Sequence, residues 1–436
     1  MLKDLRSSWF FPLLFPAFLP LIGCSLSPKS VAEVLIAIPQ IDSMRQIEGD
    51  SLFVESWELW FSQPVDHKNP KGPKFPQRVI YNHVNFDKPM VVVIEGYTLF
   101  SPLADEPTRI LGANQINIEH RFFDQSRPKD SIPWEYLNIF QSATDQHKVI
   151  QAFKPFYRGK WLSTGISKGG QATIFHRYFY PNDVDVSIPY VAPLNFSSED
   201  ERVYTFLEEV GTTECREKIR KFQAELFKRK KKLMPFVQDF ASANGYTFSM
   251  GLERAYDINV LEYNFAYWQW SGLTCDQIPD STYSDFDLFK HWATVASFDF
   301  IEDKGVDDVR PFFYQAMTEI GMYGYQTDTW NNYLNDSTSI TFEFTMPEGH
   351  KAIFDPEPMR KVNEWVQRKG NNMLYIYGEN DPWSATAVEI GPKTNAVKFV
   401  NPGGDHTTRI KSFPPELRDS IYVQLEDWLE LNIVNQ

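Results

Sequence analysis

The sequence predicts an α/β fold in which a mostly parallel sheet, covered by helices on both faces, is interrupted by a long helical insertion. Short continuous apolar runs alternate with helical segments over much of the 436-residue chain, as is typical of strands buried on both faces. One of these runs ends in a glycine-flanked serine and leads into a helix. Residues 198–347 then lack strand signals and have helical spacing, which indicates the insertion.

The first 24 residues have the pattern of an export signal. Lys3 and Arg6 give a positive start, residues 9–22 are apolar, and the segment ends in Leu21-Ile22-Gly23-Cys24. This ending resembles the bacterial lipobox, where the signal peptide is cut before the cysteine and the thiol is lipidated. We therefore expect residues 1–23 to be a lipoprotein signal peptide. Cys24 would then anchor the exported protein to a bacterial membrane, on its periplasmic or cell-surface face. The alternative is a plain secretory signal in which Cys24 is incidental.

Residues 24–48 are expected to form a tether of mixed composition, and the core is expected to begin at residue 49. Residues 53–61 and 77–84 alternate between apolar and polar side chains, which predicts two paired strands. A cluster of Pro, Asn, Lys and Gly between them, at residues 64–76, indicates a long hairpin loop.

Continuous apolar strands follow, and they divide the predicted core into two parts. The first part covers residues 49–197 and the second covers residues 348–436. The expected parallel strands are residues 90–94, 115–118, 160–164, 184–191, 373–377 and 396–400.

The segment between these two parts, residues 198–347, is predicted to be a helical cap. Helical spacing is found at residues 201–209, 214–232 and 257–270. The cap contains Cys215 and Cys275, which form a natural pair in an oxidising compartment and would close a loop of about 60 residues. The alternative is two buried free thiols.

Composition limits the partners. The net charge of −14 argues against a nucleic-acid or acidic-membrane surface as the partner. Aromatic residues make up 15% of the chain, which fits a large aromatic core or a cleft lined for peptide or carbohydrate. The cysteines have no catalytic or metal-ligand spacing, so we expect no metal and no cofactor.

The glycine-flanked serine is the strongest chemical signal. Residues 160–164 form an apolar strand that ends in Gly165-Ile166-Ser167-Lys168-Gly169-Gly170, and the following residues have no Gly or Pro until Pro181. This strand, turn and helix is the nucleophile elbow of the α/β-hydrolase fold, where glycines let the helix pass close to the strand. The context predicts that Ser167 is a nucleophile.

A serine nucleophile requires a base and a carboxylate that orients the base. In this fold they follow in the order Ser, Asp, His, in loops after late strands. Asp381 follows the strand at residues 373–377, and His406 follows the strand at residues 396–400. We therefore predict a triad of Ser167, Asp381 and His406. The rivals are Glu379 for the acid, Asp405 as a neighbour of His406, and His176 on the helix after the elbow.

The tetrahedral oxyanion requires N–H donors. One is expected to be the backbone N–H of Lys168, directly after the nucleophile. The second is expected from the loop after residues 91–94, where the N–H groups of Gly96 and Tyr97 are alternatives.

Several motifs along the chain occur together. They are the elbow with His176-Arg177, Tyr180-Pro181-Asn182-Asp183-Val184-Asp185, Tyr190-Val191-Ala192-Pro193, Gln63-Pro64-Val65-Asp66-His67, Ile94-Glu95-Gly96-Tyr97, Glu119-His120-Arg121-Phe122-Phe123, Glu214-Cys215-Arg216 and Gly378-Glu379-Asn380-Asp381-Pro382-Trp383. Together these motifs resemble the bacterial secreted tripeptidyl aminopeptidases, a family of serine peptidases. This family is similar in turn to the lysosomal Pro-X carboxypeptidase and dipeptidyl peptidase group, which shares the capped α/β-hydrolase plan. The resemblance implies an exopeptidase that releases short peptides from a free N-terminus.

An aminopeptidase must hold a substrate ammonium, for which a partly buried carboxylate is the natural partner. Glu95 and Glu119 follow the two strands before the elbow strand, so both are expected at the catalytic edge of the sheet. The alternative is that one of them forms a structural ion pair with Arg121.

Fold and triad do not choose the bond that is cleaved. A carboxylesterase or lipase is therefore the rival within the hydrolases. The rival from another class is a non-catalytic surface lipoprotein that binds peptides or glycans.

Overall fold

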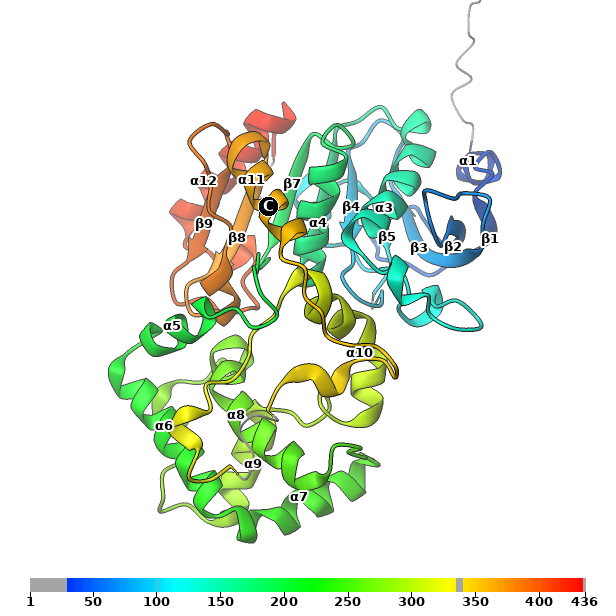
Figure 1. Cartoon of the computed structure of the whole chain (residues 1–436). Coiled ribbons are helices and arrows are strands. Elements are labelled where there is room, and N and C mark those ends of the chain that lie inside the picture. Colours follow the sequence, from blue (N-terminus) through cyan, green and yellow to red (C-terminus); the bar gives the residue numbers. More distant parts are fainter. Residues whose placement is uncertain (1–29, 100, 335–339, 434–436) are drawn as a thin grey trace, which may run out of the picture.

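The structure is a computed structural model that describes residues 30–99, 101–334 and 340–433. The predicted signal peptide and Cys24 lie outside the described residues. A sheet with helices on both faces forms one part of the molecule, and a helical cap lies beside it (Figure 1).

Within the described residues, one sheet of nine strands has the order β1-β2-β3-β5-β4-β6-β7-β8-β9. The strands from β5 to β9 in this order pair in parallel, and β1, β2, β3 and β5 pair antiparallel. The chain therefore has an α/β-hydrolase fold with a mostly parallel sheet. The strands are β1 (Ile41–Ile47), β2 (Glu55–Pro64), β3 (Lys74–His83), β4 (Met90–Ile94), β5 (Asn114–Ile118), β6 (Trp161–Ile166), β7 (Val186–Tyr190), β8 (Leu374–Gly378) and β9 (Val397–Asn401).

The expectation of a tether at residues 24–48 is wrong for the described residues from 30 onward. Helix α1 (Val31–Ile36) packs its apolar side chains into the core, and β1 pairs with β2 along its whole length. β1 escaped prediction because it is an edge strand whose side chains are mostly exposed and polar, so it carries no apolar alternation.

Helices cover both faces of the sheet, as the buried strands require. Alternate side chains of β4 show the two faces, because Val92 joins one apolar cluster while Val91 and Val93 join another. The helices on the face of Val92 are α3 (Ile139–Phe153), α4 (Lys168–Phe179) and α11 (Glu357–Lys369), and those on the other face are α2 (Glu106–Leu111) and α12 (Pro415–Leu429).

The long insertion between β7 and β8 is helical and has a core of its own. This core contains aromatic and aliphatic side chains of α6, α7, α8 and α9. The helices of the insertion are α5 (Arg202–Glu209), α6 (Thr213–Lys228), α7 (Lys230–Asn244), α8 (Leu252–Trp270), α9 (Asp285–Val295) and α10 (Asp303–Gln315). We call residues 198–347 the cap. The segment with α10 and the π-helix η5 (Ala316–Ile320) packs on the sheet domain, whereas Trp330, Leu334 and Ile340, which follow it, belong to the cap core.

Cys215 and Cys275 form a disulfide in the cap, with Cα atoms 5.2 Å apart and a sequence separation of 60 residues. It joins the start of α6 to the short 3-10 helix η4 (Cys275–Gln277), which follows α8. The other 3-10 helices are η1 (Asp124–Ser126), η2 (Trp134–Tyr136), η3 (Lys154–Phe156), η6 (Asp328–Trp330), η8 (Phe342–Thr345), η9 (Pro382–Thr386) and η10 (Ile410–Ser412).

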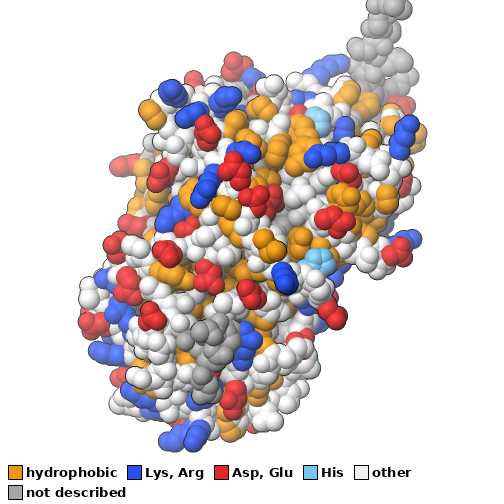
Figure 2. Space-filling view, viewed as in Figure 1, with side chains coloured by type: hydrophobic (Ala, Val, Ile, Leu, Met, Phe, Trp, Pro, Cys, Tyr) orange, Lys and Arg blue, Asp and Glu red, His pale blue; other side chains and the backbone are white. Residues whose placement is uncertain are grey.

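Acidic and basic side chains are mixed over the face of the molecule shown in Figure 2, with apolar side chains between them. Of the helices in the described ranges, none has both the length and the apolar character needed to cross a membrane.

Candidate active site

Ser167 lies at the elbow between β6 and α4, with φ 57° and ψ −122°. Residues with a side chain rarely adopt this conformation, and it places the serine at the tip of a sharp turn. The turn is tight because Gly165 faces the helix directly: a Cβ at this position would lie 2.3 Å from the carbonyl oxygen of Gly169. Ser167 remains partly exposed, and its backbone N–H donates to Tyr190 O at 2.9 Å.

Asp381 and His406 come together from two separate loops. Asp381 follows β8 and caps η9, and His406 follows β9. His406 Nδ1 lies 2.7 Å from Asp381 Oδ2, with 0% of the Asp381 side chain and 2% of the His406 side chain exposed. A buried carboxylate at Nδ1 fixes the ring orientation and leaves Nε2 as the free nitrogen.

Nε2 of His406 is buried and has no hydrogen-bond partner among the described residues. The structure thus brings Asp381 and His406 together, whereas no hydrogen bond joins His406 Nε2 to the Ser167 hydroxyl within the described residues. Catalytic hydrogen bonds of this kind are often absent before substrate binds.

The rival acids and bases have structural partners. His176 is buried and contacts Asp183 Oδ2 at 3.1 Å. Asp405 Oδ1 accepts the N–H of Thr407 at 2.8 Å, which caps the loop. Glu379 Oε2 accepts the N–H of Gly403 at 2.7 Å. None of these three side chains contacts the Ser167 hydroxyl in the described structure.

The loop after β4 lies against the elbow, as the oxyanion prediction requires. Gly96 is in such close contact that a Cβ would lie 2.4 Å from the backbone N of Gly169. The backbone N–H groups of Gly96 and Tyr97 donate to no group in the described part of the chain. The N–H of Lys168 begins α4 and therefore has no partner within the helix.

Glu119 does not fit the expected role of a substrate clamp. Its side chain is fully buried, and its two oxygens accept hydrogen bonds from Leu99 N, Thr98 Oγ1, Ser126 N and Ser126 Oγ, at 2.6–3.1 Å. These bonds hold its own loop together and leave no oxygen free for a substrate. Arg121, the expected ion-pair partner, instead binds Asp145 through Nε at 2.7 Å.

Glu95 is different, because it is partly exposed and no Lys or Arg of the described chain forms an ion pair with it. Burial, together with the nearby carboxyl groups of Asp105 and Glu119, raises the pKa of Glu95 to about 8, although the side chain of Asn117 acts in the opposite direction. Glu95 therefore lies in an acidic environment that lacks a cation.

Helix α8 of the cap contacts both triad loops, which the sequence did not reveal. The carbonyl of Gln269 accepts the backbone N–H of His406 at 3.2 Å, and the Trp270 ring packs edge-on against the His406 ring at 5.0 Å. Phe265 packs against Trp383, directly after the Asp381 loop, at 5.3 Å. The end of α8 therefore closes one side of the site.

A buried carboxyl group of the cap was also missed. Glu262 Oε2 accepts the hydroxyls of Tyr323 at 2.9 Å and Tyr325 at 2.7 Å. Burial raises the pKa of Glu262 to about 7, and the two tyrosine hydrogen bonds act against that rise. Some 60 residues separate Glu262 from the tyrosines, so no local sequence signal identifies the cluster.

Comparison with known proteins places this geometry in a family. The sequence profile of the PS-10 peptidase S37 family matches residues 27–434. The chain belongs to this family of serine peptidases. It is 33% identical over 378 residues to the prolyl tri/tetrapeptidyl aminopeptidase of Streptomyces mobaraensis, a match that covers 85% of this chain and 79% of that protein. The predicted family of bacterial tripeptidyl aminopeptidases is confirmed, and the protein is a serine peptidase.

More distant relatives share less. A probable serine protease of Arabidopsis thaliana is 27% identical over 149 residues, covering 29% of this chain and 30% of that protein. Among solved structures, the proline iminopeptidase of Mycobacterium smegmatis is 14% identical and has a TM-score of 0.38, covering 89% of this chain and 99% of its own. The epoxide hydrolase of Vigna radiata is 12% identical, also with a TM-score of 0.38, and covers 89% of this chain and 99% of its own.

Proposed function

We propose that the protein is an exported serine aminopeptidase that removes short peptides from a free N-terminus with a triad of Ser167, His406 and Asp381. The observation that carries the proposal is the buried contact between Asp381 and His406, which leaves His406 Nε2 without a partner in the described residues. The two residues lie in loops after β8 and β9, and Ser167 lies in the elbow after β6. The similarity to a prolyl tri/tetrapeptidyl aminopeptidase supports the substrate class.

In the first half of the reaction, the Ser167 hydroxyl turns toward His406. Ser167 Oγ attacks the scissile carbonyl carbon while Nε2 of His406 takes the hydroxyl proton. The C–O double bond opens and its electron pair moves to the oxygen, which the N–H of Lys168 and an N–H of the β4 loop stabilise. Asp381 stabilises the imidazolium that forms.

The tetrahedral intermediate then collapses, and the C–N bond breaks. His406 gives its proton to the leaving amine, which departs as the shortened peptide. The N-terminal fragment of the substrate stays bound to Ser167 as an ester. A water molecule, deprotonated by His406, attacks this ester, and the same steps release the fragment and restore the serine.

Selection of N-termini is assigned to Glu95. Its partly exposed carboxyl group has acidic neighbours and no cation, so a substrate ammonium supplies the missing positive charge. Because an adjacent ammonium favours the ionised form of a carboxyl group, binding would release the Glu95 proton that burial otherwise retains. Glu119 is not included, since its oxygens are already occupied.

Export and anchoring rest on the sequence of residues 1–24. If Cys24 carries the lipid, cells expressing the full chain in the presence of labelled palmitate will yield a labelled, membrane-bound protein. Cys24→Ser will be unlabelled and will leave the membrane fraction. Labelled Cys24→Ser protein would contradict lipidation at this residue.

The decisive experiment for the enzyme combines labelling and product analysis. A fluorophosphonate should form an adduct on Ser167 in the wild-type protein, and Ser167→Ala and His406→Ala should remove it. Products from a ladder of peptides, with proline or alanine before each cut, should be two to four residues long and come from free N-termini. Absence of an adduct would favour the binding lipoprotein, whereas turnover of p-nitrophenyl esters without peptide turnover would favour an esterase.

A further inference from the structure

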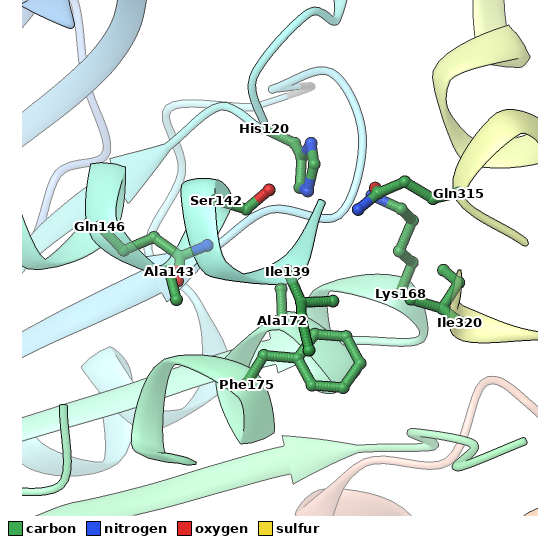
Figure 3. Close-up of a pocket in the computed structure, with 10 residues that line it drawn as sticks. All are labelled: His120, Ile139, Ser142, Ala143, Gln146, Lys168, Ala172, Phe175, Gln315 and Ile320. Atoms are coloured by element: carbon green, nitrogen blue, oxygen red, sulfur yellow. The ribbon is translucent and has the colours of Figure 1, made fainter. Parts of the chain in front are cut away.

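A small cavity lies behind the nucleophile elbow, on the side of α4 away from the triad loops. Its volume is about 10 Å³. Figure 3 shows the side chain of Lys168 extending along it toward Gln315, with His120 on the opposite wall. Lys168 is the residue directly after the nucleophile, and its side chain is buried although its backbone N–H belongs to the predicted oxyanion hole.

The Lys168 amine has one defined acceptor, the carbonyl oxygen of Gly96, at 2.7 Å. The rings of Phe123 and Tyr97 lie 5.2 and 5.8 Å from Nζ. Burial lowers the pKa of the Lys168 amine well below its usual value, and the carboxyl group of Glu319, which accepts the N–H of Ile139, acts against this shift. Burying a long side chain that ends in an amine is expensive, so its retention at this position indicates a task that an apolar residue would not perform.

The geometry of one peptide unit suggests that task. In a trans peptide the C=O and N–H bonds point in opposite directions, and the Gly96 carbonyl and the Tyr97 N–H belong to the same unit. Because the carbonyl points to the Lys168 amine behind the elbow, the Tyr97 N–H points to the opposite side. That N–H has no partner in the described residues, and the Tyr97 carbonyl is held by the N–H of His120 at 3.1 Å.

We propose that Lys168 is a positioning residue for both oxyanion donors. Its own backbone N–H supplies the first donor, and its side-chain amine fixes and polarises the Gly96–Tyr97 peptide so that the Tyr97 N–H supplies the second. A donor bonded to a carbonyl strengthens the N–H of the same amide, because hydrogen bonds in a chain polarise one another. The inference deepens the proposed function and rests on it. It assigns the second oxyanion donor to the N–H of Tyr97 instead of that of Gly96.

The apolar substitution Lys168→Met removes the amine and keeps the length of the side chain. We expect kcat to fall about 10- to 100-fold, which is no more than the fall caused by removing a whole oxyanion donor. KM should change less than about twofold. Affinity for a prolinal-terminated tripeptide aldehyde, whose hemiacetal oxygen occupies the oxyanion hole, should fall by the same factor as kcat/KM. Rates are divided by the number of sites titrated with fluorophosphonate, so a loss of folded protein does not alter them.

Ile139→Val is the matched control, because Ile139 lines the same cavity without touching Gly96. It should leave kcat and aldehyde affinity unchanged. If Lys168→Met keeps the wild-type kcat per titrated site, the positioning role is overturned.

A crystal structure of the wild-type protein with the same aldehyde provides a second test that needs no variant. The hemiacetal oxygen should lie within hydrogen-bond distance of the N–H groups of Tyr97 and Lys168. An oxygen bonded to Gly96 N instead would overturn the inference and leave the peptidase intact. A wild-type protein that forms no adduct with either reagent would overturn the proposed function itself.

Discussion

Ser167 is held in a conformation that costs about 1–3 kcal/mol in a residue with a side chain, and the surrounding backbone enforces it. Its N–H is tied to Tyr190 O, and glycines on both sides bring strand and helix into contact. The strain presents Oγ at the tip of the turn while the backbone N–H of Lys168 remains free for an oxyanion.

Asp381 and Asp405 can be compared directly, because Asp381 lies next to His406 in space and Asp405 precedes it in the chain. Only Asp381 contacts the imidazole. Asp381→Asn should lower kcat about 10⁴-fold, since the ring then favours the wrong tautomer. Asp405→Asn should change kcat less than about threefold. Steady-state hydrolysis of a tripeptide p-nitroanilide measures both, and similar losses in the two variants would contradict the assignment.

Glu95→Gln tests the ammonium clamp on the same kind of substrate. The substitution removes a charge and keeps the shape, so turnover of a free tripeptide p-nitroanilide should fall about 10-fold or more, mainly through KM. The N-acetylated peptide should be affected less than twofold. Glu119→Gln is the comparison variant: it should lower the melting temperature by disturbing its loop, with no preference between the two peptides. Equal loss on free and blocked peptides in Glu95→Gln would reject the clamp.

The pairing of Asp381 with His406 could be predicted from sequence because each residue has a local signal: a strand followed by a loop that carries the side chain. Glu119 does lie at the end of β5, as the sequence predicted. The prediction could not show that Leu99 N and Ser126 Oγ, from neighbouring loops, bind its carboxylate oxygens. The contacts of Trp270 with His406 and of Glu262 with Tyr325 join distant segments, so a single sequence does not contain them.

At the scale of elements, α8 connects the cap to the catalytic loops. Its buried aromatic side chains form much of the cap core, and its last turn contacts His406. The sequence predicted a helix at residues 257–270, and the structure extends it to Leu252–Trp270. The single helix expected at residues 214–232 is instead two, α6 and α7, because the chain bends at Arg229, which binds Glu225 and Asp285.

The Cys215–Cys275 disulfide closes a long loop just beyond the end of α8. For a sequence separation of 60 residues, the chain-entropy model gives a stabilisation of about 4 kcal/mol. The double variant Cys215→Ala/Cys275→Ala should therefore unfold at a lower urea concentration, and dithiothreitol should shift the wild-type protein in the same direction without affecting the variant. An unchanged urea midpoint in both experiments would show that the bridge does not stabilise the cap.

At the scale of the whole molecule, the alternation of buried strands and helices predicted the parallel sheet, and the loss of that alternation indicated the insertion. β1 was missed because an exposed edge strand carries little apolar pattern. The packing of α10 and η5 on the sheet domain could not be predicted either, because the apolar face of a helix does not identify the surface on which it packs. Periodicity identifies elements more readily than it identifies their partners.

The buried carboxyl group of Glu262 makes the free energy of unfolding depend on pH. The pKa of Glu262 is raised to about 7 in the fold, from an ordinary value of 4.5. Below pH 4.5 both folded and unfolded chains bind its proton, so it does not alter stability. Between pH 4.5 and 7 only the folded chain keeps the proton, and the free energy of unfolding falls as pH rises, by up to about 1.4 kcal/mol per unit. Above pH 7 the loss is complete.

Glu262→Gln should remove this contribution. Measured by urea unfolding between pH 4.5 and 8, the variant should gain stability relative to the wild-type protein as pH rises, and the difference should level off near pH 7. Tyr325→Phe is the matched variant, because it deletes a hydrogen bond that favours the ionised carboxylate. It should raise the pKa of Glu262 and move the levelling point to higher pH. A difference between Glu262→Gln and wild type that stays constant over this range would mean that Glu262 titrates alike in the folded and unfolded chains.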